Sequence, residues 1–226
     1  MYLERSGADT WNDIAVGGSQ RWKVTDPSAH KVALSHMHRY FKNNEINSIL
    51  CPLAGDDPMA HLLWQQGHSV TAIDLVPLAL ERMRQQFDGE WSKEEDGRDD
   101  GMVVWKHDSG RATQYQGDAL KYLPELKESF DAIYDKDSFG ALGVEMRQAY
   151  CKRISEYTKK NAFVYLECKL KENHNAVKDN GPPFSLKMED LVEWFGGSFD
   201  HAESLGSVYP LSMPTAQQTA HILKRK

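Results

Sequence analysis

Cysteine is scarce in this chain of 226 residues, and its three copies stand far apart. Cys51, Cys151 and Cys168 are odd in number and show no CxxC spacing, which argues against a disulfide framework and a structural zinc site. Free cysteine is usually buried in proteins. We therefore expect buried free thiols, no metal site and a reducing compartment, the cytoplasm.

Apolar runs and basic residues are also in short supply. No stretch approaches the ~20 apolar residues that span a membrane, and residues 1–6 contain no apolar segment of the kind that directs secretion. Lys and Arg number 27 against 33 Asp and Glu, a net charge of −6, whereas proteins that bind nucleic acid show basic surfaces. We expect neither a membrane nor a nucleic acid as a partner.

The negative charge is concentrated in one segment. Residues 88–100 contain seven acids and two bases, and so carry five of the six negative charges. A run of like charge is typical of a solvated surface. We expect an acidic surface loop here and a nearly neutral remainder of the domain.

What the chain does contain is an alternation of short apolar runs and helical periodicities. The run 46–53 is followed by a helix pattern that Asp57 and Pro58 can open and Gly67 can close. A second run, 69–73, precedes another helical periodicity. This β-α-β-α order predicts parallel strands joined by right-handed crossovers.

Further apolar runs lie at 103–106, 113–116, 130–134, 162–166 and 219–223. The first two flank a turn and predict a hairpin. We predict one α/β domain over residues 1–226, a three-layer sandwich around a Rossmann-like, seven-stranded, mostly parallel sheet with an antiparallel C-terminal edge. Residues 1–43 are expected to form an N-terminal lid and a helix.

Gly55 and Asp74 have the spacing of a nucleoside-binding site. An acid about 20 residues after the first glycine loop, at the end of the second strand, can accept hydrogen bonds from ribose hydroxyls, although it can also simply cap the next helix. The loop lacks the GxGxxG of dinucleotide sites, and Asp56 and Asp57 would repel a phosphate. S-adenosylmethionine fits better, because acids and aromatic faces attract its sulfonium cation.

Four short segments resemble the thiopurine S-methyltransferase family. They are PLAG at 52–55, GHSV at 67–70 followed by Asp74, YDKD at 134–137 and GPPF at 181–184. The likeness runs from about Trp11 to Leu223 with the elements in order. The stretch 137–147 is also similar to plant halide and thiol methyltransferases.

The resemblance implies a methyltransferase that acts as a monomer on a small-molecule acceptor, with S-adenosylmethionine as its cofactor. Asp135 and Lys136 would serve catalysis, and Lys136 and Phe184 would face the acceptor. The residues that the resemblance assigns to the cofactor are Trp11, Trp22, Leu53, Gly55, Asp74, Leu75, Asp118, Ala119 and Asp135.

Four departures from the family pattern leave the acceptor open. Asp56, Met59, Ala15 and Lys136 replace a lysine, an acid, an aromatic residue and an arginine. Our interpretation is in-line methyl transfer to a thiol, with Lys136 lowering the thiol pKa. A halide or thiocyanate methyltransferase and a catalytically silent S-adenosylmethionine-binding protein remain alternatives. A nicotinamide oxidoreductase is disfavoured by the missing second loop glycine.

Overall fold

The computed structural model describes residues 27–41, 45–94 and 98–226. Its helices are α2 (Pro27–His38), α3 (Met59–Gln65), α4 (Pro77–Arg84), α5 (Val144–Tyr157), α6 (His174–Val177) and α7 (Met188–Phe195), with 3-10 turns η1 (Pro124–Leu126) and η2 (Phe139–Ala141). Its strands are β1 (Ser48–Pro52), β2 (Ser69–Asp74), β3 (Trp91–Lys93), β4 (Val103–His107), β5 (Ala112–Gln116), β6 (Phe130–Lys136), β7 (Thr158–Lys171), β8 (Phe199–Tyr209) and β9 (Ala216–Arg225).

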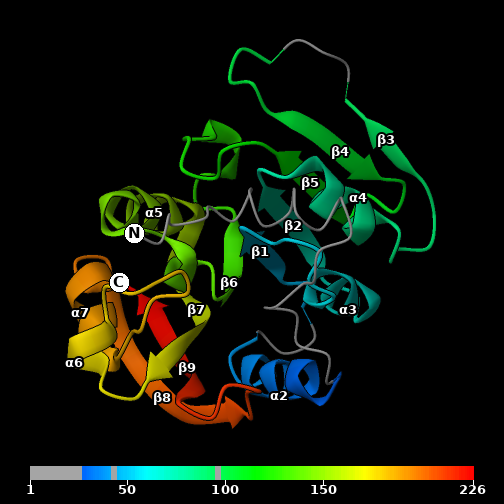
Figure 1. Cartoon of the computed structure of the whole chain (residues 1–226). Coiled ribbons are helices and arrows are strands. Elements are labelled where there is room, and N and C mark those ends of the chain that lie inside the picture. The colour runs from blue at the N-terminus through cyan, green and yellow to red at the C-terminus, as the bar shows by residue number, and fades with distance from the viewer. Residues whose placement is uncertain (1–26, 42–44, 95–97) are drawn as a thin grey trace.

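One sheet contains all of these strands, in the order β3-β4-β5-β2-β1-β6-β7-β9-β8 (Figure 1). The five central strands from β5 to β7 are parallel, and both edges are antiparallel. The α/β class, the β4–β5 hairpin and the antiparallel C-terminal edge are confirmed. The predicted count of seven strands is wrong, because the described residues form nine.

Helices cover both faces of the sheet and give the predicted three layers (Figure 1). Successive residues of a strand point to opposite faces. On β1, Leu50 therefore packs in the apolar cluster that includes α5 and α7. Its neighbours Ile49 and Cys51 pack in the cluster that includes α2, α3 and α4. Since the central strands are buried on both faces, they read as continuous apolar runs in the sequence.

Aromatic side chains explain why part of the acidic segment joins the sheet. Trp91 of β3 pairs with His107 of β4, and their ring centroids are 5.1 Å apart. The ring centroid of Phe87 lies 5.3 Å from that of Trp91 and 5.2 Å from that of Trp64 of α3. The expectation of an acidic loop over 88–100 rested on charge alone, and the described part of that segment contains a short strand anchored by Trp91.

No helix in the described part of the chain has both the length and the apolar character needed to cross a membrane.

The packing of α3 on the sheet predicts that its two adjacent leucines contribute unequally to the free energy of unfolding. Leu63 is fully buried, whereas Leu62 is half-buried at the margin of the same cluster. Leu63→Ala should lower the free energy of unfolding by about 3 kcal/mol, through lost burial and the cavity left behind. Urea denaturation measures this, with Leu62→Ala as the matched control. Equal losses in the two variants would contradict the described packing.

Candidate active site

Hydrogen bonds join the carboxyl ends of four neighbouring strands. The amide of Gly55, after β1, donates to Asp74 Oδ2 at the end of β2 (2.8 Å). The amide of Gly117, after β5, donates to the carbonyl of Asp74 (2.9 Å), and Ser138 Oγ, after β6, donates to the carbonyl of Pro52 (2.7 Å). The structure thus brings together the loops in which the predicted cofactor residues lie, which is the usual ligand position in an open α/β sheet.

The loop after β1 has an unusual backbone. Leu53 and Gly55 have φ values of 45° and 56°, in the left-handed region that glycine tolerates and that is costly for leucine. The amide of Ala54 donates to the carbonyl of Ile73 (3.1 Å) and helps to hold this shape. Strain of this kind is concentrated at ligand sites, so the loop is a strong candidate for direct contact with a cofactor.

Asp74 and Leu75 fit a nucleoside. Asp74 is buried, and its Oδ1 also accepts from the amide of Val76 (2.8 Å). Burial raises the pKa of Asp74, and backbone hydrogen bonds from Val76, Gly55 and Leu75 oppose that shift. The three amides use three of the about four lone-pair sites of the carboxylate, so one remains for a ribose hydroxyl. Leu75 beside it is 59% exposed, an apolar surface next to the position where the base of a nucleoside would lie.

Asp118 and Ala119 lie in the loop after β5. Asp118 Oδ1 accepts from the amide of Leu120 (2.9 Å), and Ala119 packs at the margin of the core. The bond from Gly117 to Asp74 keeps this loop beside the end of β2. This position suits the predicted contact with the adenine.

Both carboxylate oxygens of Asp135 accept hydrogen bonds from the protein. Asp135 is buried, its Oδ1 accepts from the amides of Ser138 (2.9 Å) and Phe139 (3.2 Å), and its Oδ2 accepts from the Tyr150 hydroxyl (2.7 Å). Burial raises the pKa of Asp135 to about 6 against these hydrogen bonds. Its clearest effect in this structure is to fix the loop after β6. Sequence reasoning missed Ser138 and Tyr150, although Asp135 and Ser138 have the spacing of a side-chain-to-backbone turn.

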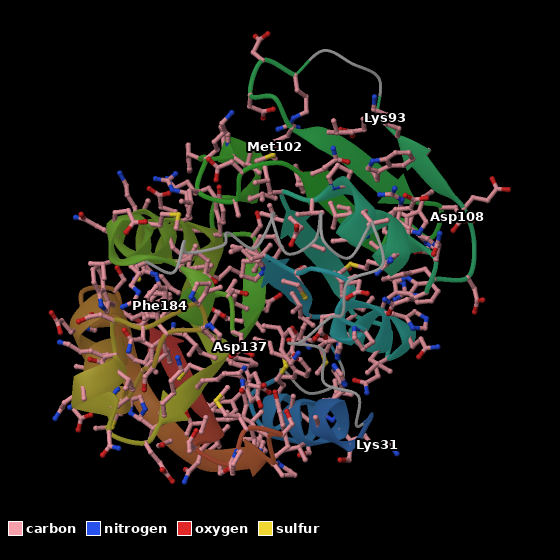
Figure 2. The ribbon with its side chains drawn as sticks, in the orientation of Figure 1. Lys31, Lys93, Met102, Asp108, Asp137 and Phe184 are labelled. Atoms are coloured by element: carbon pink, nitrogen blue, oxygen red, sulfur yellow. The ribbon has the colours of Figure 1, made fainter. Side chains whose placement is uncertain are left out.

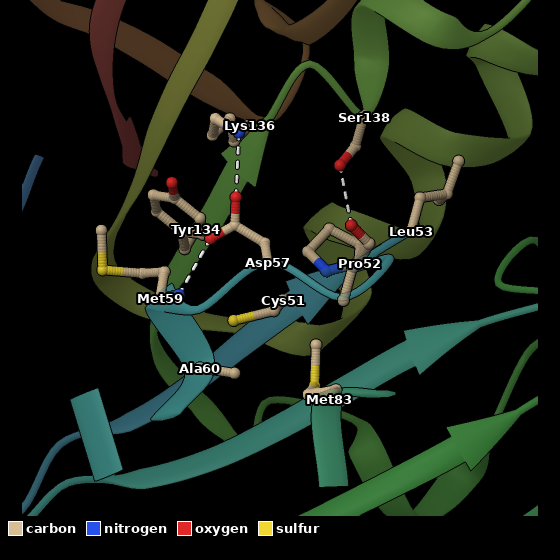
Figure 3. Close-up of a pocket in the computed structure, with 11 residues that line it drawn as sticks. Cys51, Pro52, Leu53, Asp57, Met59, Ala60, Met83, Tyr134, Lys136 and Ser138 are labelled. Carbon is tan, nitrogen blue, oxygen red and sulfur yellow. Dashed lines mark hydrogen bonds and ion pairs between the residues drawn. The ribbon is translucent and has the colours of Figure 1, made fainter. Parts of the chain in front are cut away.

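Lys136 lies in a small pocket between the loop after β1 and the end of β6 (Figure 3). Its Nζ forms an ion pair with Asp57 Oδ2 (2.9 Å), and both side chains are largely buried. Asp57 also faces His30 Nε2 (3.2 Å) and accepts from the amide of Met59 (2.9 Å), the helix-opening role expected of it. The attraction of Lys136 holds the pKa of Asp57 below its usual range despite burial.

The Tyr134 hydroxyl also lines this pocket. It is buried and has no hydrogen-bond partner among the described residues, and Figure 3 shows it on the same side as the Lys136 ammonium. Sequence reasoning read Tyr134 as the end of an apolar strand and the first residue of the YDKD segment, and nothing in the local pattern distinguishes its hydroxyl.

The structure describes the predicted acceptor residue Phe184 but not the two tryptophans predicted to bind the cofactor. Phe184, labelled in Figure 2, is buried in the segment between α6 and α7. Its amide donates to the carbonyl of Gly140 (2.8 Å), which joins this segment to η2. Trp11 and Trp22, and the lid expected around them, lie outside the described residues.

A second buried acid lies beside Lys136, on β7. Glu167 accepts from the hydroxyls of Tyr165 (2.8 Å) and Tyr209 (2.6 Å) and from the side-chain amide of Gln218 (3.3 Å). Burial raises the pKa of Glu167 to about 7. The acid is therefore satisfied by neutral donors instead of by an ion pair.

Comparison with known proteins identifies the family. A family model described as thiopurine S-methyltransferase matches residues 7–219, nearly the whole chain. The chain belongs to the thiopurine S-methyltransferase family. Relatives include a probable thiopurine S-methyltransferase of Danio rerio, 25% identical over 79% of this chain and 78% of that protein. A thiopurine S-methyltransferase of Acinetobacter baylyi is 25% identical over 80% of this chain and 83% of that protein.

Solved structures of methyltransferases share the fold. The N-methyltransferase NodS of Bradyrhizobium japonicum, in complex with S-adenosylhomocysteine, has a TM-score of 0.64 at 12% identity and covers 96% of this chain and 98% of its own. A TehB-like methyltransferase of Corynebacterium glutamicum has a TM-score of 0.58 at 14% identity, over 96% of this chain and 94% of its own. With the family match, these findings make the protein an S-adenosylmethionine-dependent methyltransferase, and the strand-end loops fit that cofactor.

The buried ion pair predicts strong coupling between Asp57 and Lys136. Asp57→Asn leaves the Lys136 ammonium without its carboxylate and should cost about 3 kcal/mol of unfolding free energy. Adding Lys136→Met removes the stranded charge, so the double variant should lose less than the sum of the single variants. Urea denaturation of the parent, the two single variants and the double variant measures the coupling. If the losses of unfolding free energy simply add, the two charges do not stabilise each other.

The raised pKa of Glu167 predicts how stability changes with pH. The folded pKa of about 7 lies above the ordinary value of 4.5, so the folded state binds the proton more tightly than the unfolded state. The stabilisation from this group is complete below about pH 4.5 and is lost as the pH rises through 7. Glu167→Gln should therefore gain up to about 3 kcal/mol relative to the parent between pH 5 and 8.

Urea denaturation at the two pH values tests this expectation, with Glu203→Gln as the control. Hydrogen bonds from Tyr40 and Arg39 lower the pKa of Glu203, so its effect should stay constant over that range. A constant difference for Glu167→Gln as well would show that Glu167 is ionised throughout.

Proposed function

We propose that this protein transfers the methyl group of S-adenosylmethionine to a small soft nucleophile, most of all a thiol. The observation that carries the proposal is the convergence of the strand-end loops, with Gly55 and Asp74 joined by a hydrogen bond, in a chain of this family. When bound, the cofactor supplies an activated methyl group on a sulfonium. The chain's own residues then have to bind and align the reactants, which can supply about 7–11 kcal/mol of the barrier.

The roles of the residues follow from their positions. Asp74 would accept from the ribose, Leu53 and Gly55 would lie beneath the methionine part, and Leu75 with Ala119 would border the adenine. Lys136 would donate to the acceptor: its ammonium has three donors, and one hydrogen bond, to Asp57, is found among the described residues. The nearby carboxylate offsets its charge, so Lys136 is a weaker means of lowering a thiol pKa than an unpaired cation.

Methyl-labelled S-adenosylmethionine, a panel of thiols and anions, and capture of volatile products test the acceptor class. The panel contains thiophenol, 2-mercaptoethanol, iodide and thiocyanate. We expect labelled thioethers from the thiols. Transfer to the anions but to neither thiol would overturn the thiol acceptor, and cofactor binding without any transfer would favour a silent binding protein.

Asp74 predicts a specific loss of cofactor affinity. Asp74→Ala removes the ribose acceptor and the partner of the Gly55 amide, and should weaken binding of S-adenosylhomocysteine at least tenfold, since a hydrogen bond to a charged group is worth about 1.5–3 kcal/mol. Isothermal titration calorimetry measures the change. Asp108→Ala is the matched control, because Asp108 is an exposed acid in the β4–β5 turn (Figure 2). Unchanged affinity in Asp74→Ala would remove Asp74 from the cofactor site.

A further inference from the structure

Arg147 is a buried cation in the first turn of α5. Its side chain is enclosed by aromatic rings, and only 6% of the residue is exposed. The guanidinium carbon lies 5.1 Å from the ring centre of Phe184, 5.3 Å from that of Phe139 and 5.9 Å from that of Trp194. Ring faces attract a guanidinium and partly replace its lost hydration.

The charge of Arg147 has no carboxylate partner in the described part of the chain. Its Nε donates to the carbonyl of Leu142 (3.1 Å), but its Nη2 is buried and makes no hydrogen bond there. Asp190, Asp179 and Glu145 act on it only through longer-range attraction. Arginine does not lose its proton in proteins, and an unsatisfied buried donor is costly. An anionic ligand would satisfy this atom.

The topology places Arg147 on the acceptor side of the site. Phe139 follows β6 and Phe184 follows β7, two adjacent parallel strands whose carboxyl ends share an edge with the loop after β1. The bond from Ser138 Oγ to the Pro52 carbonyl joins the loop after β6 to that loop. The cage around Arg147 is therefore built partly from the loops that flank the predicted cofactor position, with Trp194 of α7 as its third ring.

Lys136 and Arg147 differ in the charge that each can offer. Lys136 forms an ion pair with Asp57 at 2.9 Å, which largely cancels its field. No such pair is found for Arg147 among the described residues, and aromatic rings hold it without neutralising it. Of these two cations near the predicted acceptor position, Arg147 is the one left to balance a negative charge.

We propose that Arg147 binds the negative charge of an anionic acceptor, a thiolate or a soft inorganic anion, through its free Nη2. The inference rests on the proposed function, because it defines the acceptor class of the same site. Arg147 would be a binding residue that selects ionised nucleophiles, and the aromatic cage would keep water from competing for its charge.

The test is equilibrium binding of thiocyanate to the full chain saturated with S-adenosylhomocysteine, followed by tryptophan fluorescence at constant ionic strength. We expect saturable binding to the parent and at least tenfold weaker binding to Arg147→Met. The matched control is Arg84→Met, since Arg84 also lies over an aromatic ring, Trp105, but donates to Gln114. Arg84→Met should bind thiocyanate like the parent.

The possible results separate this proposal from the proposed function. If the parent binds S-adenosylhomocysteine but not thiocyanate, or if Arg147→Met binds thiocyanate unchanged, the anion site is overturned and the methyltransferase assignment stands. If S-adenosylhomocysteine itself does not bind, the proposed function fails. Where Arg147→Met does not fold, Arg147→Lys decides: its point charge lacks the planar fork, so at least threefold weaker binding supports the proposal and unchanged affinity refutes it.

Discussion

The parallel alignment of β5, β2, β1 and β6 is the constraint on which the site depends. Because these strands run in one direction, their carboxyl ends meet at one edge of the sheet, and the loops that follow them must share that space. The contacts between Asp74 and both Gly55 and Gly117, and between Ser138 and Pro52, join the loops directly. Residues separated by about twenty to ninety positions thereby become neighbours, and the strained backbone of the loop after β1 is held between them.

Burial of acids at this edge is offset in three different ways. Backbone amides satisfy Asp74 and Asp135, a lysine neutralises Asp57, and tyrosine hydroxyls satisfy Glu167. The consequences for the pKa differ accordingly: it falls only for Asp57, where a full opposite charge outweighs desolvation, and rises for the other three. The local arrangement of partners, and not the net charge of −6, decides which acids remain ionised near neutral pH.

The sequence predicted the elements that obey local rules. Apolar runs and helical spacing identified β1, α3, β2, α4 and β6, because period and capping act over a few residues. The strand β3 was missed because its acidic neighbours outweighed one anchoring tryptophan, whose partner His107 lies sixteen residues away. The pair of Asp57 and Lys136 spans seventy-nine positions, and no sequence pattern distinguishes it from two solvated charges. A signal for Arg147 was present, since it precedes Tyr150 and Ile154 on the buried stripe of α5.

Electrostatics connects these observations to the chemistry of the site. Acids near the strand ends favour a cationic cofactor, and the same acids disfavour an anionic acceptor unless a positive charge on the other side compensates for them. A cation neutralised by its own carboxylate cannot supply that compensation at a distance, whereas a cation held by ring faces and carbonyls keeps its field. The two sides of a methyl-transfer site thus need different partners for their buried charges. In this chain, Asp57, Asp74 and Asp118 lie in or beside the loops after β1, β2 and β5. Neutral donors hold Asp135 of β6 and Glu167 of β7, and the aromatic cage around Arg147 lies on that side.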